Sequence, residues 1–92
     1  MKYNVIFEKQ ALDWLRESIR YENKDNIDKL YEILEELKIY PTTGIGNPEQ
    51  LRYSLYGKWS RRINENDRIL YEIVEERESQ CVVIISVFVH CR

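Results

Sequence analysis

The chain has 92 residues and a mass of 11.2 kDa, which is enough for one domain spanning residues 1–92 and too little for two. Hydrophobic residues make up 43% of it, which predicts a folded core and excludes disorder. The 14 basic and 16 acidic residues give a net charge of −2, which excludes a wholly basic nucleic-acid coat but allows a local basic patch.

The first part of the chain predicts one strand followed by two helices. Their expected ranges are a strand at 3–7, a helix over 9–22 and a helix over 27–37. The strand is aromatic and β-branched, whereas apolar residues in the helices recur at a spacing of three and four. The polar stretch between the helices offers Asp25 or Asn26 as a cap, and Pro41 ends the second helix.

The second part predicts a run of strands after a loop rich in glycine and proline. The loop covers 42–48, and the expected strands cover 51–55, 59–64, 68–74 and 81–89, with a turn at Gly57 and Lys58. The last strand is apolar on both faces and should lie inside the sheet. The order β-α-α-β-β-β-β predicts an α+β fold, with both helices on one face of a mostly antiparallel twisted sheet.

Few cysteine and histidine residues are present that could hold a zinc ion. Cys81 and Cys91 form no Cys-x-x-Cys motif, and His90 is the only histidine. These residues predict no disulfide framework, no metal site and no cofactor. The start lacks the apolar region of a signal peptide, and the longest apolar stretch is too short for a bilayer. We therefore expect a cytoplasmic protein without membrane contact.

Arginines gather on the predicted strands. Arg52, Arg62 and Arg68 each leave the apolar row of their strand, so they could share one sheet surface and bind phosphate. The alternative is a set of solvated strand faces with cross-strand ion pairs. Arg61 falls on the apolar side, where it must snorkel or pair with a carboxylate.

Aromatic residues are interleaved with these arginines. Tyr56, near Arg52 and the predicted turn, is a candidate for stacking on an RNA base, whereas Trp59 is expected in the core. His90 lies just past the last predicted strand, with the same parity as Ser86.

Three runs of residues carry a resemblance to a known family. They are Asn47–Arg52, Leu55–Ile63 and Asp67–Tyr71, and His90 follows near the end. Together with the predicted order of elements, they make essentially the whole chain resemble the YoeB/Txe branch of the RelE toxin superfamily. The resemblance implies a RelE-like fold and a ribonuclease that cleaves mRNA in the ribosomal A site.

The resemblance also implies partners. They are a cognate antitoxin whose C-terminal tail wraps the toxin, the 70S ribosome with its mRNA, and a second copy of the chain in a homodimer. DNA would be reached only indirectly, through the antitoxin.

Functional roles transfer from the family one residue at a time. Glu49 falls at the general-base position, Arg68 at the position that stabilises the transition state, and His90 at the general-acid position. Arg52 and Arg62 match positions that hold the phosphate.

These roles make a coherent reaction without a metal. Glu49 accepts the proton of a ribose 2′-OH, Arg68 offsets the charge on the phosphorane, and His90 protonates the leaving 5′-oxygen. The product is a 2′,3′-cyclic phosphate. The family has a tyrosine directly after the histidine, but this chain has Cys91, so the role of that aromatic residue does not transfer.

Two other functions stay open. A toxin of the same fold could block a protein target such as DNA gyrase without cutting RNA. Glu49 and His90 favour the nuclease, because a blocker needs neither acid nor base. A degenerate module that only binds antitoxin and DNA is the second alternative, and Cys91 is the one feature pointing to it.

Overall fold

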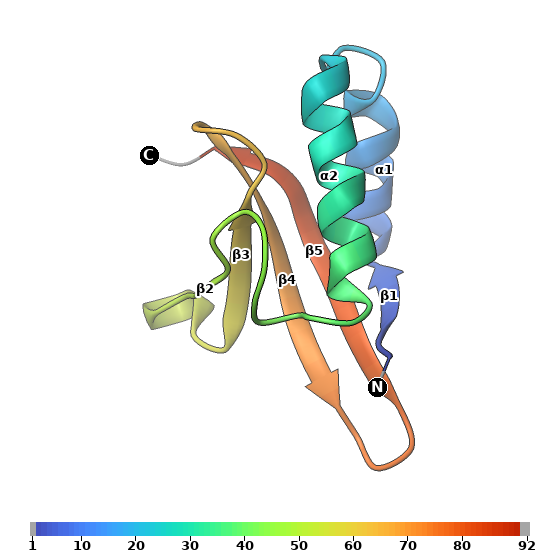
Figure 1. Ribbon diagram of the computed structural model, residues 1–92, viewed down its shortest axis with the longest axis vertical. Helices are drawn as coiled ribbons and strands as arrows, with labels where there is room; N and C mark the ends of the chain where they lie inside the picture. Colours follow the sequence, from blue (N-terminus) through green and yellow to red (C-terminus); the bar gives the residue numbers. More distant parts are fainter. Residues whose placement is uncertain (1, 91–92) are drawn as a thin grey trace.

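The computed structural model describes residues 2–90 (Figure 1). Its elements are β1 Asn4–Phe7, α1 Lys9–Ser18, α2 Lys24–Leu37, β2 Glu49–Gln50, a 3-10 helix Tyr53–Leu55, β3 Lys58–Arg62, β4 Asp67–Glu75 and β5 Gln80–His90. The predicted order of two helices between a first strand and a run of four strands is confirmed.

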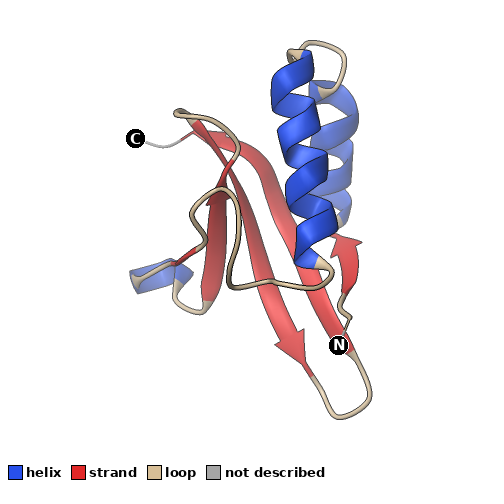
Figure 2. Cartoon of the chain, in the orientation of Figure 1, coloured by secondary structure: helices blue, strands red, loops and turns tan. Residues whose placement is uncertain are grey.

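The strands form one mixed sheet in the order β1-β5-β4-β3-β2. β1 runs parallel to β5, and every other neighbouring pair is antiparallel. β5 therefore has a partner on each side, which confirms the internal position predicted for the last strand. The two helices run side by side and pack on the same face of the sheet (Figures 1 and 2).

The core lies between this face and the helices. The apolar stripe of α2 supplies four buried residues, Leu30, Ile33, Leu34 and Leu37. They join one cluster with buried residues of α1, β4 and β5 and the partly buried Trp59 of β3. Within residues 2–90, no helix is both long and apolar enough to cross a membrane.

The region between the helices differs from its prediction. α1 ends at Ser18 rather than near residue 22, because Ile19 and Tyr21 are exposed and no packing holds a further helical turn. Asn23, not Asp25 or Asn26, caps α2, and its side chain accepts the N–H of Asn26 at 2.9 Å.

The strand predicted at 51–55 is wrong. Strand pairing with β3 covers Glu49–Gln50, and one further backbone hydrogen bond joins the N–H of Leu51 to the carbonyl of Lys58 at 2.8 Å. The chain then turns through the 3-10 helix Tyr53–Leu55. The alternation that predicted a strand does not reflect burial, since Tyr53 is 92% exposed and Leu55 is 40% exposed.

β5 is irregular where it crosses β4. Tyr71 lies opposite Ile84 and Leu70 opposite Ser86, but Arg68 lies opposite Val89, so β5 carries extra residues at two bulges. Because the second bulge lies between Ser86 and Val89, counting residues along β5 no longer gives their faces, and the predicted parity of the His90 side chain lies outside the described part.

Candidate active site

Glu49 and Arg68, the predicted base and the predicted transition-state arginine, meet in the structure. Nη1 of Arg68 lies 3.4 Å from Oε2 of Glu49 and donates at 3.1 Å to the hydroxyl of Ser60. The Glu49 side chain is 54% exposed, whereas that of Arg68 is 16% exposed. The carboxylate is thus open to a ligand, and the arginine is held beneath it.

Strand register brings these groups together. Glu49 lies opposite Ser60 across β2 and β3, and Arg62 lies opposite Arg68 across β3 and β4. Directly paired residues point to the same face of a sheet, and Ser60 and Arg62 share a face because they are two residues apart. The site therefore lies on the face opposite to the one that carries Ile69 and Tyr71 into the core.

Arg68 keeps unused hydrogen-bonding capacity. Its Nε is buried and has no hydrogen-bond partner among residues 2–90. A buried donor without a partner costs free energy. Because Nε has almost no exposed surface, an anion would have to bind through the terminal nitrogens of the guanidinium. The long contact with Glu49 is weak for an ion pair, so it leaves the guanidinium available to a phosphate.

The other two predicted phosphate-binding arginines are exposed. Neither Arg52 nor Arg62 forms an ion pair with any described residue. Arg62 shares the sheet face with Arg68, as predicted. Arg52 does not lie on a strand, because it immediately precedes the 3-10 helix that replaces the predicted strand.

Two exposed tyrosines follow Arg52. Tyr56, the predicted base contact, is 78% exposed just after the 3-10 helix. Tyr53 is 92% exposed and has a positive φ of 60°, a conformation uncommon for a bulky residue. The sequence alternation assigned Tyr53 to a strand and so concealed this feature.

The predicted general acid lies at the end of β5. The backbone of His90 is paired opposite Asp67, one residue from the Arg68 and Val89 pair. The side chain of His90 and the whole of Cys91 lie outside the part that the structure describes.

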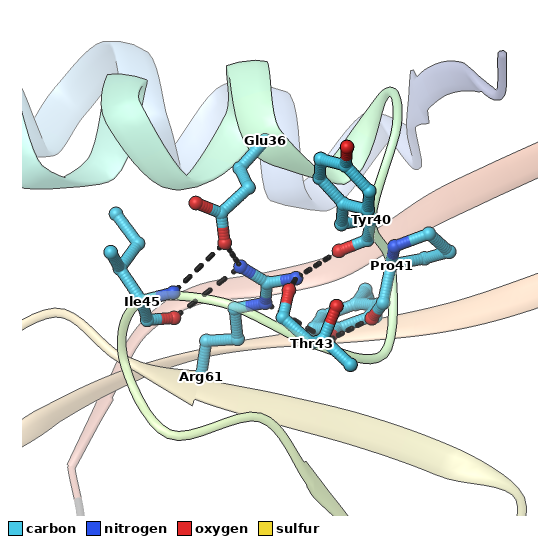
Figure 3. A network of polar contacts seen from close by, with 7 residues as sticks. Glu36, Tyr40, Pro41, Thr43, Ile45 and Arg61 are labelled. Carbon is cyan, nitrogen blue, oxygen red and sulfur yellow. Dashed lines mark hydrogen bonds and ion pairs between the residues drawn. The ribbon is translucent and has the colours of Figure 1, made fainter.

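Arg61 lies on the other face of β3. It is fully buried and pairs with Glu36 of α2 (Figure 3), so of the two predicted outcomes it pairs with a carboxylate and does not snorkel. Its Nε also donates to the hydroxyl of Tyr71 at 3.3 Å. Burial raises the pKa of Tyr71 above its ordinary value, although the hydrogen bond from Arg61 acts in the opposite direction.

Curated relatives of the chain are toxins. Toxin YoeB from Escherichia coli K12 is 35% identical over 54 residues, which cover 59% of this chain and 64% of that protein. Toxin YoeB from Synechocystis is 36% identical over 53 residues, which cover 58% of this chain and 62% of that protein. The chain therefore matches less than two thirds of the length of these relatives.

Solved structures are similar over nearly the whole chain. A YoeB/ParE toxin from Agrobacterium tumefaciens has a TM-score of 0.84 at 24% identity, over 96% of this chain and 99% of that one, which shows the fold. A YoeB dimer from Staphylococcus aureus has a TM-score of 0.77 at 29% identity, over 99% of this chain and 100% of that one. A heterotetrameric YoeB-YefM toxin-antitoxin complex from Staphylococcus aureus has the same TM-score and coverage at 28% identity.

A family model covers nearly the whole sequence as well. The model described as the YoeB-like toxin of bacterial type II toxin-antitoxin systems matches residues 7–91, a range that includes every predicted site residue. The chain therefore belongs to the YoeB-like toxin family of bacterial type II toxin-antitoxin systems.

Proposed function

We propose that this toxin is a ribosome-dependent endoribonuclease that cleaves mRNA in the ribosomal A site of the cytoplasm and so inhibits translation. The observation that carries the proposal is the meeting of Glu49 and Arg68 on one sheet face, with Arg62 opposite Arg68 in the strand register. A carboxylate beside two arginines suits a reaction that moves a proton and builds charge on a phosphate.

In the proposed reaction, Glu49 accepts the proton of the ribose 2′-OH. The 2′-oxygen then attacks the adjacent phosphorus, and the bond from phosphorus to the 5′-oxygen breaks. His90 gives its proton to that 5′-oxygen, so the products are a 2′,3′-cyclic phosphate and a free 5′-OH. Proton loss and proton gain therefore balance within one step.

The arginines act on charge rather than on protons. Arg68 stabilises the pentavalent phosphorane with its positive charge, because Ser60 holds its guanidinium on the same sheet face as Glu49. Arg52 and Arg62 hold phosphates of the message, and Tyr56 stacks on a base. The exposure of these last three residues leaves them accessible to RNA.

A cognate antitoxin inhibits the toxin by covering Arg52, Arg62 and Arg68 with an acidic tail. The solved YoeB-YefM complexes of Staphylococcus aureus support a protein antitoxin, and the solved YoeB dimer supports a homodimer. Charge complementarity would steer such a tail to the arginines and block the RNA at the same time.

Mapping of mRNA 5′ ends after induced expression tests this function. We expect new 5′ ends within translated messages and none within the same messages lacking a start codon. Growth arrest without new ends would reject the nuclease and favour a toxin that blocks a protein target such as DNA gyrase.

A further inference from the structure

A buried arginine fastens the segment that leads to Glu49. Arg61 is 0% exposed on the helix-facing side of β3, and Figure 3 shows its guanidinium between α2 and the loop after it. Every N–H of this group has an acceptor. The acceptors are the Glu36 carboxylate, the Tyr71 hydroxyl and the backbone carbonyls of Tyr40, Thr43 and Ile45.

Glu36 and Arg61 together hold both backbone polar groups of Ile45. The N–H of Ile45 donates at 2.8 Å to Oε1 of Glu36, and the same oxygen accepts Nη1 of Arg61 at 2.5 Å. Nη1 also donates to the carbonyl of Ile45 at 3.3 Å. Tyr71 adds a further contact by donating its hydroxyl to the carbonyl of Pro41 at 2.7 Å.

Two glycines allow the segment to come this close. A Cβ at Gly44 would lie 1.5 Å from Oε1 of Glu36, and one at Gly46 would lie 2.7 Å from the carbonyl of Arg62. The Gly46 carbonyl also accepts the N–H of Arg62 at 2.6 Å. Since only Asn47 and Pro48 separate Gly46 from β2, these contacts fix where Glu49 enters the sheet.

The contacts of Arg61 indicate that it holds the backbone of the loop in one conformation. A buried ion pair can often be replaced by apolar residues of similar size without loss of stability. Apolar residues would not satisfy the carbonyls of an irregular loop, whereas one planar guanidinium reaches several of them. On the opposite face, the neighbours Ser60 and Arg62 lie beside Arg68. Strand β3 thus holds the loop before β2 on one face, through Arg61, and Arg68 on the other face, through Ser60.

We propose that Arg61, acting with Glu36, is a positioning residue that sets Glu49 against Arg68 for RNA cleavage; the proposal rests on the function proposed above. It assigns Arg61 no contact with RNA. Loss of the Arg61 contacts therefore slows the chemical step and leaves RNA binding largely intact.

The test is the double variant Glu36→Leu/Arg61→Met, which removes both charges and leaves neither stranded. We expect its circular dichroism to match the wild type, and its single-turnover cleavage on programmed ribosomes to be about 100-fold slower with an unchanged KM. The control Lys24→Gln/Asp28→Asn removes an exposed ion pair of α2 and should cleave at the wild-type rate.

A second measurement separates positioning from general destabilisation. In the Glu49→Gln background, the double change should cost little further activity, because the group it positions is already lost. A folded double variant with wild-type cleavage, or fully additive losses with Glu49→Gln, would overturn the proposal. If the double variant does not fold, Arg61→Lys replaces it on both measurements, because lysine keeps the charge without the planar set of donors.

Amide hydrogen exchange tests the Arg61 contacts without relying on nuclease activity. The amides of Arg62 and Leu51 donate to the carbonyls of Gly46 and Lys58 at the two ends of the fastened segment. Both should exchange faster in the variant, while β4 and β5 stay protected. A wild-type protein that cleaves no RNA would reject the proposed function, whereas unchanged exchange would reject the positioning role in either case.

Discussion

Arg62 and Arg68 are direct partners across β3 and β4, so two guanidinium groups leave the same face of the sheet side by side. Like charges directly opposite each other destabilise a strand pair. Among the described residues, Glu49 forms an ion pair with Arg68, and Arg62 forms none. A bound anion would therefore relieve the repulsion between the two guanidinium groups and stabilise this pair of strands.

Phosphate should consequently stabilise the protein through these arginines. We expect inorganic phosphate to raise the melting temperature of the wild type at low ionic strength. In the absence of phosphate, Arg62→Ser should raise the free energy of unfolding by about 0.2–1 kcal/mol, because the like-charge pair is removed. In the presence of phosphate, its melting temperature should rise much less than that of the wild type. Arg20→Ser removes an exposed arginine just after α1 and serves as the control. Equal responses in the wild type and Arg62→Ser would contradict the phosphate site.

Removing a catalytic group should abolish toxicity without unfolding the protein. We expect Glu49→Gln, Arg68→Gln and His90→Gln each to relieve growth arrest, because each removes a charge or a proton carrier. Removing a general acid or base typically costs about 100- to 10,000-fold in rate. Glu49→Gln should keep the melting temperature, since the side chain is 54% exposed. Full growth arrest in all three variants would show that the assigned site is wrong.

Cleavage should not depend on a protein-bound metal. The proposed roles of base, acid and charge stabiliser are all taken by side chains, Glu49, His90 and Arg68. Ribosomes need Mg²⁺, so they are first cross-linked with their message, and EDTA is then added with the toxin. We expect an unchanged single-turnover rate. Loss of cleavage that Mn²⁺ or Zn²⁺ restores, with cross-linked ribosomes still intact, would refute the acid-base reaction.

Alkaline pH should destabilise the fold through Tyr71. Burial raises its pKa above the ordinary value of 10.0, so the folded protein retains a proton that the unfolded chain releases. This contribution to stability is complete below pH 10 and is lost as the pH rises towards the pKa of the folded state. Urea unfolding between pH 7 and pH 11 should show a shallower loss for Tyr71→Phe, which cannot titrate.

At neutral pH the same variant should be less stable. Tyr71→Phe removes the donor to the Pro41 carbonyl and the acceptor for Arg61, which typically costs about 1–3 kcal/mol. Identical alkaline slopes for the two proteins would exclude Tyr71 as the source of the pH dependence.

The sequence predicts well the order of the helices and strands and the sheet face on which Arg61 lies. It predicts poorly which distant residues come into contact. Arg61 is recognisable as a buried charge, because it falls in an apolar row of β3. Its partner Glu36 is not, since it lies 25 residues away on a helix whose surface carries several carboxylates. Only the packing of α2 on the sheet selects Glu36.

Two other failures have equally physical causes. Alternation at 51–55 arises from exposed residues such as Tyr53, so period alone misses the 3-10 helix. The second bulge in β5 shifts parity between Ser86 and Val89, and no local residue signals it because bulges depend on the facing strand. Glu49 and Arg68 were predicted by motif, but their contact depends on the register of three strands.

We expect a cognate antitoxin to restrain the toxin by covering its exposed arginines. An acidic tail lying on Arg52, Arg62 and Arg68 would be steered there by charge and would cover the positions that RNA phosphates need. Arg62→Ala should therefore weaken antitoxin binding and RNA cleavage together. Loss of one partner of a buried charge pair typically costs about 2–5 kcal/mol in binding.

The competing mechanism is inhibition from the helix face, with the site distorted at a distance. Calorimetric titration of the cognate antitoxin into Arg62→Ala and into Arg16→Ala, an exposed arginine of α1, distinguishes the two. Direct occlusion predicts a large loss of affinity for Arg62→Ala and little change for Arg16→Ala. The reverse pattern would place the inhibitory contact on the helices, because Arg62 lies on the sheet face that they leave uncovered.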